Sequence, residues 1–208
     1  MKKLSTSKQM AINMVAAIVS FLIGTGINFV LAPYLVKELG SETYGFIGLA
    51  NNFVQYATIV TSALNSMSGR FISIEYSKGN IDKASRYFSS VLVADLIIAG
   101  VLLLVSSIIT FNIEFILNVP ENLVDSVKIL FAFTFATFII SVITAIFTTA
   151  AFVKNKLYIN SLRDIASNTL KLLLVVILFS FFPAKVYFLA MASLASGIFL
   201  LLTLSLIH

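Results

Sequence analysis

Long apolar runs separated by short polar stretches make up almost the whole chain. A helix needs about 20 apolar residues to cross a bilayer, and each run is about that length or longer. The pattern predicts an all-α polytopic membrane protein, with a basic cytoplasmic tail at 1–9 and a single bundle of six transmembrane helices at 10–207. We expect these helices at about 10–36, 43–69, 87–111, 126–153, 164–182 and 186–207.

The second run has a polar side. Its polar residues recur at spacings of three and four, so they share one helix face, and the opposite face is apolar. Amides carry several donors and acceptors that need partners, and helix packing alone rarely needs four of them on one face. We therefore expect this face to line a water-filled cavity. The polar stripe consists of Asn51, Asn52, Gln55, Thr58, Ser62, Asn65, Ser66 and Gly69.

Two other runs carry weaker stripes of small and hydroxyl residues. One stripe lies on the first run, and the other is a hydroxyl-rich face on the run at 126–153. Such residues are also common where membrane helices pack together, so packing and cavity lining both remain open for these two faces. The stripes are Asn13, Ala17, Ser20, Gly24 and Asn28 on the first run, and Thr134, Thr137, Ser141, Thr144 and Thr148 on the other.

The composition excludes several classes of protein. Hydrophobic residues make up 59% and charged residues 11% of the 208 residues, against about 45–50% and roughly 25% in a soluble domain. The chain has no cysteine, and its single histidine is His208, so thiolate and histidine metal sites are not expected. Walker, HExxH and G-x-S-x-G motifs are absent from the sequence. We expect no metal, no cofactor and no enzymatic activity.

The basic residues, which give a net charge of +5, predict an orientation rather than a nucleic-acid partner. Cytoplasmic loops of membrane proteins carry an excess of lysine and arginine. With a cytoplasmic N-terminus, ten of the 14 basic residues fall on the inner side, three on the outer side, and Lys171 lies within a helix. We expect a multi-pass protein of the cytoplasmic (inner) membrane in contact with its lipids. The inner residues are Lys2, Lys3, Lys8, Arg70, Lys78, Lys83, Arg86, Lys154, Lys156 and Arg163, and the outer residues are Lys37, Lys128 and Lys185.

Two ionisable residues, Asp95 and Lys171, lie well inside predicted spans, away from the span ends. A charge at the bilayer centre costs roughly 2.5–3.5 kcal/mol on insertion scales, so such residues are candidates for function. Asp95 is interpreted either as a proton or cation site or as part of a structural ion pair. Lys171 is interpreted as a cavity-lining cation, with snorkelling to the interface as the alternative. Arg70, at the end of the stripe, is either a bidentate phosphate ligand or a topology anchor.

The segment LGSETYG at 39–45, preceded by Pro33, resembles the start of the oligosaccharide flippases. These are the polysaccharide-biosynthesis exporters of the multidrug/oligosaccharidyl-lipid/polysaccharide superfamily. Their members commonly open with a basic tail, a first helix ending in proline, a Leu-Gly-x-x-x-Tyr-Gly hinge, and a long second helix ending near an arginine. The matching residues here are Pro33, Leu39, Gly40, Tyr44, Gly45 and Arg70.

The resemblance implies a transporter that flips an undecaprenyl-diphosphate-linked oligosaccharide during surface polysaccharide biosynthesis, for example of O-antigen for lipopolysaccharide. Such flippases have about twelve or more helices in two lobes. We therefore expect this chain to be the N-terminal lobe of a longer protein, and a six-helix protein that dimerises is the alternative. The expected pathway residues are Asn51, Asn52, Gln55, Asn65, Arg70, Asp95 and Lys171.

Two other functions remain open at this point. A cation-coupled multidrug antiporter of the same superfamily would use Asp95 as its ion site. A membrane subunit or scaffold without transport activity would need none of the candidate pathway residues.

Overall fold

The computed structural model describes residues 6–153 and 155–205, and the part it describes is helical with no strand. Predictions for Lys2, Lys3, Lys154 and His208 lie outside the described residues. The helices extend beyond several of the expected ranges. They are α1 (Thr6–Leu39), α2 (Ser41–Ser77), α3 (Ile81–Phe111), the short α4 (Ile113–Ile116), a 3-10 turn (Glu121–Leu123), α5 (Val124–Val153), α6 (Leu157–Phe181) and α7 (Phe188–Ser205).

Four segments among the described residues are long and apolar enough to cross a bilayer, which confirms an all-α polytopic membrane protein. The apolar part of α7, Phe188–Thr203, is shorter, and α2 is less apolar because it carries the polar stripe. The count of six spans therefore stays a prediction. The four segments are Ser7–Leu39, Ile81–Phe111, Glu121–Val153 and Leu157–Phe181.

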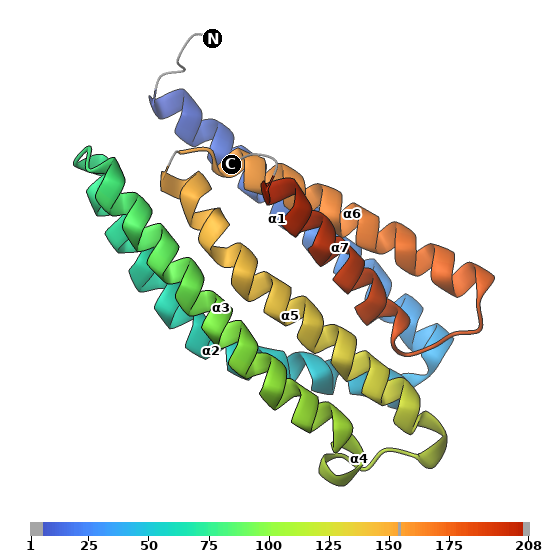
Figure 1. The fold of residues 1–208 in the computed structure, drawn as a ribbon. Helices are drawn as coiled ribbons and strands as arrows, with labels where there is room; N and C mark the ends of the chain where they lie inside the picture. The colour runs from blue at the N-terminus through green and yellow to red at the C-terminus, as the bar shows by residue number, and fades with distance from the viewer. Residues whose placement is uncertain (1–5, 154, 206–208) are drawn as a thin grey trace.

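The long helices run side by side with two distinct ends (Figure 1). The hinge end holds Gly40, α4 and the connection between α6 and α7. The N-terminal end holds the start of α1, the turn at 78–80 and the loop around Asn155. Among the described basic residues, Lys37, Lys128 and Lys185 lie towards the hinge end, and the others except Lys171 lie towards the N-terminal end.

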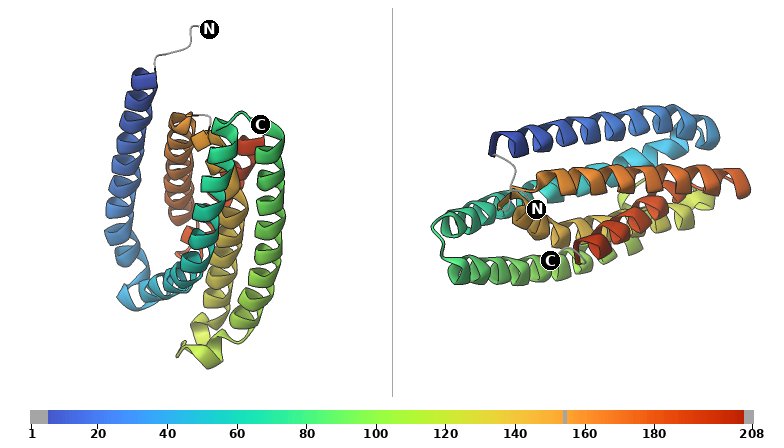
Figure 2. Two further views of the ribbon diagram at one scale, coloured as in Figure 1. Left: turned by 90° about the vertical axis from the view of Figure 1, so that its left-hand side faces the viewer. Right: turned by 90° about the horizontal axis from the view of Figure 1, so that it is seen from above.

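The packing divides the bundle around α5. On one side α5 packs against α2 and α3, and on the other it packs against α7. α6 packs on α7, and α1 packs chiefly on α6. α1 and α2 meet at the hinge and diverge towards the N-terminal end (Figure 2).

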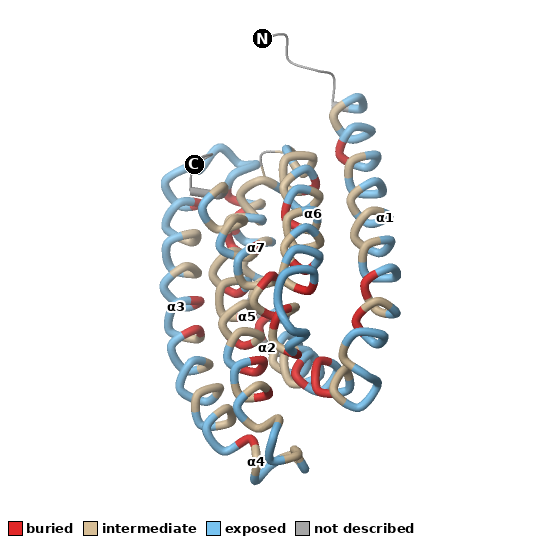
Figure 3. Tube along the Cα trace, turned by 90° about the vertical axis from the view of Figure 1, so that its right-hand side faces the viewer, coloured by how far each residue is buried: buried red, intermediate tan, exposed pale blue. Residues whose placement is uncertain are grey.

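The core is thickest at the hinge end, where two clusters of buried apolar side chains lie. One is built around Phe131 and Ile113, and the other around Val175 and Leu35. A smaller cluster around Ile146 supports the opposite end. Figure 3 shows that much of α1 is exposed on the tube trace, with its buried positions confined to a few sites. The bundle is therefore held firmly at the hinge and more loosely where α1 and α2 diverge.

Gly40 forms the hinge between α1 and α2. Its φ of 79° lies in the left-handed region that favours glycine. Its N–H donates to the carbonyl of Val36 and its carbonyl accepts from Tyr44, both at 3.0 Å. Serine often caps helices, but Ser41 does not cap α2. Ser41 is the first helical residue and Gly40 occupies the cap position without a side-chain bond.

Candidate functional site

A cavity of about 570 Å³ lies between α1, α2, α5, α6 and α7, and we call it the hinge-side cavity. It lies where α1 and α2 begin to separate, so helices distant in sequence contribute its walls. Its apolar lining includes Leu31, Ile47 and Phe138. Its polar lining residues are Asn28, Asn51, Thr58, Thr134, Thr137, Ser141, Lys171 and Ser193.

Lys171 is the charged residue of the hinge-side cavity. It reaches α1, where its ammonium donates to Oδ1 of Asn28 over 3.3 Å. α1 and α6 are packed together nearby, since a Cβ atom at Gly24 would lie at van der Waals distance, 3.4 Å, from Nδ2 of Asn168. The cation is thus directed toward another helix of the cavity rather than along its own helix.

Three hydroxyl groups of α5 line the cavity, and each already donates its hydrogen to a backbone carbonyl of α5. Thr134 and Thr137 each donate over 2.8 Å to the carbonyl four residues earlier, and Ser141 donates over 2.7 Å to the carbonyl of Phe138. Their oxygen atoms keep acceptor capacity. The question left open for this hydroxyl face is answered in favour of cavity lining at these three positions.

A second cavity, of about 620 Å³, lies farther from the hinge between α2 and α5, with Leu157 of α6 at its edge. We call it the distal cavity. It is lined by Asn65, Ser66 and Gly69 of the polar stripe and by Arg70, which follows the stripe. The stripe that looked continuous in sequence therefore serves two separate spaces. The full lining is Asn65, Ser66, Gly69, Arg70, Ser73, Ile74, Thr148, Thr149, Phe152 and Leu157.

Three candidate residues line neither cavity. Asn52 and Gln55 are exposed on α2. Asp95 is only 2% exposed on α3, a helix that packs against α2 and α5. Its Oδ2 has no hydrogen-bond partner among the described residues, and no described ion pair includes it.

Several polar ties that hold the helices around these cavities have no signature in the sequence. Asn13 of α1 is buried, donates to Oδ1 of Asn155 over 2.8 Å, and accepts from the backbone N–H of Tyr158 over 3.0 Å. It therefore caps the start of α6 and fixes the free end of α1. Farther along α6, Arg163 ties this helix to α7. It donates to Oγ1 of Thr203 over 3.0 Å and to the backbone carbonyl of Leu200.

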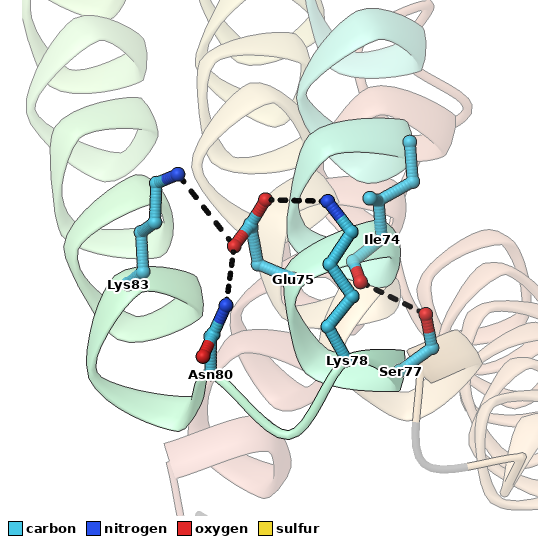
Figure 4. Close-up of polar contacts among 6 residues, drawn as sticks. All are labelled: Ile74, Glu75, Ser77, Lys78, Asn80 and Lys83. Atoms are coloured by element: carbon cyan, nitrogen blue, oxygen red, sulfur yellow. Dashed lines mark hydrogen bonds and ion pairs between the residues drawn. The ribbon is translucent and has the colours of Figure 1, made fainter.

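Glu75 closes the turn between α2 and α3 (Figure 4). Its Oε2 accepts from Nδ2 of Asn80 at 3.1 Å and lies 3.6 Å from Nζ of Lys83, and its Oε1 accepts from Lys78 at 3.3 Å. The Asn80 bond and the lysine ammonium groups lower the pKa of Glu75, against the opposing effect of burial. Two lysines predicted as topology determinants thus have a carboxylate partner.

A second ion pair holds the short helix α4 at the hinge end. Nζ of Lys128 lies 2.9 Å from Oε1 and 2.8 Å from Oε2 of Glu114. This hydrogen-bonded ammonium lowers the pKa of Glu114. The pair anchors α4 to α5, next to the buried Ile113.

Comparison of the sequence with known proteins identifies a family and a relative of this chain. Residues 10–207 match the family described as polysaccharide biosynthesis protein. The chain belongs to this family. It is 33% identical over 187 residues to the Bacillus subtilis (strain 168) protein named "Uncharacterized membrane protein EpsK". The alignment covers 90% of this chain and 37% of that relative, so the chain spans less than half of the relative's length. No solved structure matches the chain.

The family assignment confirms the resemblance to polysaccharide-biosynthesis exporters given by the hinge LGSETYG. It also identifies a multi-pass membrane protein related to polysaccharide biosynthesis, because the relative is itself a membrane protein and four described helices can span a bilayer.

Proposed function

We propose that this chain forms one lobe of a transporter that flips a lipid-linked oligosaccharide, of the undecaprenyl-diphosphate type, across the cytoplasmic membrane for surface polysaccharide biosynthesis. The observation that carries the proposal is the hinge-side cavity. It places the ammonium of Lys171 beside amides and hydroxyls within helices whose outer faces are apolar.

The chemistry of the cavity suits a carbohydrate headgroup. Sugars present many hydroxyl groups that both donate and accept, and Asn28, Asn51 and the α5 hydroxyl oxygens offer complementary atoms. The volume of about 570 Å³ falls in the range of roughly 300–1,000 Å³ typical of small-molecule sites. Lys171 adds attraction for a negative charge on the headgroup or its phosphate.

The outer surface suits the lipid part of such a substrate. Large apolar side chains on α1 and α3 are strongly exposed, among them Phe29 at 81% and Leu104 at 64%. A lipid tail remains in the bilayer while the headgroup crosses through the polar interior. The distribution of basic residues supports the proposed orientation, in which the N-terminal end of the bundle faces the cytoplasm and the hinge end faces the opposite side.

A second lobe, supplied by the same protein or by a second copy, completes the pathway in this proposal. α1 diverges from α2 beyond the hinge (Figure 2) and much of its surface is exposed (Figure 3), so this side of the bundle offers surface to a second lobe. Rocking of the two lobes against each other would expose the cavity first to one side of the membrane and then to the other.

The test is the loss of transport when the cavity charge is removed. Lys171→Met keeps the length of the side chain, and we expect it to reduce surface polysaccharide about tenfold or more in the host cell. Lys185→Met is the matched control, because Lys185 lies in the exposed connection before α7 and lines neither cavity. Normal polysaccharide in cells carrying Lys171→Met, at normal protein level in the membrane, would contradict the proposal.

A cation-coupled antiporter is the second candidate, and the buried Asp95 is the observation that favours it. Asp95→Asn keeps the shape of the side chain and removes its ability to ionise. Drug accumulation that depends on a proton or sodium gradient in cells with the wild-type protein, and is lost with Asp95→Asn, would support antiport. Drug accumulation that changes neither with the ion gradient nor with Asp95→Asn would exclude antiport.

A further inference from the structure

The distal cavity differs in chemistry from the hinge-side cavity. We propose that it is a separate docking site for the phosphate group of a lipid, with Arg70 as the phosphate ligand. The proposal rests on the proposed function only in assigning this lipid to the transported substrate. The site itself is argued from the side chains that line it.

The two cavities lie at different positions along α2. No residue lines both of them. Thr58 is a hinge-side lining residue of α2, and Arg70 lies twelve positions later, or about 18 Å along the helix axis. Between the distal cavity's two main helices, Gly69 makes a close contact, because a Cβ atom there would lie 3.4 Å from Cγ2 of Thr149.

Arg70 is an available cation in the described part of the molecule. Three of the other described basic side chains near the N-terminal end have partners. Lys78 and Lys83 contact Glu75, and Arg163 binds α7. Arg70 makes no hydrogen bond or ion pair among the described residues, and its exposed guanidinium carries the planar donor set that binds phosphate with two parallel bonds.

Neutral polar groups lie beside Arg70 in the same cavity. Asn65, five positions earlier on α2, has a buried Oδ1 with no hydrogen-bond partner among the described residues. The side-chain amide of an asparagine also carries two N–H donors, and the hydroxyls of Ser66 and Thr148 can donate as well. A phosphate accepts from all of these donors, and a bridging water that donates to the Asn65 oxygen can link it to the phosphate.

The lining also includes large apolar side chains, which distinguish a lipid phosphate from a free anion as the ligand. These apolar lining residues are Ile74, Phe152 and Leu157, and Phe152 is 58% exposed. A soluble anion gains nothing from these side chains. A lipid places its phosphate at Arg70 and the first part of its hydrocarbon chain against them, which removes apolar surface from water. The site is at the end of the bundle that the proposed orientation assigns to the cytoplasm, where a lipid-linked precursor would enter.

The experiment measures binding to the purified protein, as its host cell makes it, by titration calorimetry in detergent. Three probes separate the parts of the ligand. Geranylgeranyl diphosphate carries chain and phosphate, inorganic pyrophosphate carries the anion alone, and geranylgeraniol carries the chain alone. The variants are Arg70→Gln, Arg70→Lys and the control Arg86→Gln. Arg86 is an exposed arginine near the same end of the bundle that lines neither cavity.

We expect Arg70→Gln to weaken binding of geranylgeranyl diphosphate about tenfold or more, as the loss of charged hydrogen bonds requires. Arg70→Lys should bind with intermediate affinity because it keeps the charge and loses the paired geometry. Arg86→Gln should bind as the wild type does, and geranylgeraniol should bind equally to all four proteins. Pyrophosphate should bind the wild type at least about tenfold more weakly than the lipid diphosphate.

Equal binding of geranylgeranyl diphosphate by Arg70→Gln and the wild type would overturn the assignment. Equal binding of pyrophosphate and geranylgeranyl diphosphate would replace the lipid site by a free-anion site. The unfolding temperatures of the variants control for loss of fold. Since no transport is measured, normal binding in Arg70→Gln combined with lost polysaccharide in Lys171→Met would reject this site and leave the proposed function intact. The reverse pair of results would reject the function and keep the site.

Discussion

Lys171 on α6 and Asn28 on α1 are joined by a hydrogen bond of 3.3 Å from Nζ to Oδ1, inside the hinge-side cavity. This contact links a cation to a neutral amide rather than to a carboxylate, so the positive charge is oriented but not neutralised. In the proposed transporter that charge remains available to a substrate.

The first prediction concerns this availability. Asn28→Asp changes one atom of the side chain and gives Lys171 an ionic partner, which would compete with an anionic substrate. We expect surface polysaccharide to fall roughly tenfold, equivalent to a loss of about 1.4 kcal/mol. Asn28→Gln is the neutral control and should retain most of the activity. Full activity in Asn28→Asp would show that the charge of Lys171 is not used by the substrate.

The second prediction concerns the free end of α1. Asn13→Ala removes the bonds to Asn155 and the cap on Tyr158 at the start of α6, and leaves their buried polar groups without partners. We expect the free energy of unfolding to fall by about 1–3 kcal/mol. Thermal unfolding in detergent measures it. Asn118→Ala is the control, because Asn118 is exposed and makes no hydrogen bond in the described structure. An equal change in the free energy of unfolding of both variants would show that the hydrogen bonds of Asn13 do not stabilise the fold.

A third prediction follows from the lowered pKa of Glu75. A carboxyl whose pKa is lower in the folded state stabilises the fold above its unfolded value, and this contribution is lost as the pH falls through the folded value. The wild type should therefore unfold at a higher temperature than Glu75→Gln at neutral pH. The difference should shrink below about pH 4.5, the ordinary value for this group. Glu121→Gln, at an exposed position, should show no such dependence. A difference that is constant from pH 7 to pH 3 would contradict the role of the charge.

The fourth prediction concerns the close approach of α2 and α5. Gly69→Leu places a side chain against Thr149 and into the distal cavity, so we expect a loss of about 1–3 kcal/mol in stability. Gly100→Leu on α3 is the matched control, since a Cβ atom there meets no atom within 4 Å. Both changes favour helix formation, and the difference between their unfolding temperatures isolates the packing effect. Equal stability would show that the contact at Gly69 yields without cost.

The sequence predicted the features that depend on local pattern. The spacing of the polar residues on α2, the hinge at Gly40 and the position of Lys171 all follow from periodicity and from single-residue chemistry. The division of the stripe between two cavities did not follow, because it depends on α2 leaving α1 and packing on α5. That arrangement depends on the packing of α2 against α3 and α5, which the pattern of α2 alone does not reveal.

The polar contacts between residues distant in the chain could not be predicted from the sequence either. Asn13 and Asn155 are 142 positions apart, and either residue alone resembles an ordinary small polar position in or near a membrane helix. Residue preference alone would favour Ser41 as the cap of α2, but the structure places Gly40 at the cap position. Glu75 has no distinctive sequence context, and only the fold shows that Asn80 and Lys83 return to it.

The central claim is that polar residues within the bundle line a water-accessible pathway. The 208 residues contain no cysteine, so single cysteines can be labelled in a background without other thiols. Asn51→Cys lies in the hinge-side cavity, and Phe29→Cys lies on the apolar outer face of α1, where the native side chain is 81% exposed. A membrane-impermeant, charged methanethiosulfonate reagent reacts with thiols in water and not with those in lipid. We predict rapid labelling of Asn51→Cys, slowed by the lipid-linked substrate, and no labelling of Phe29→Cys. An unreactive Asn51→Cys in a folded, membrane-inserted protein would contradict the account.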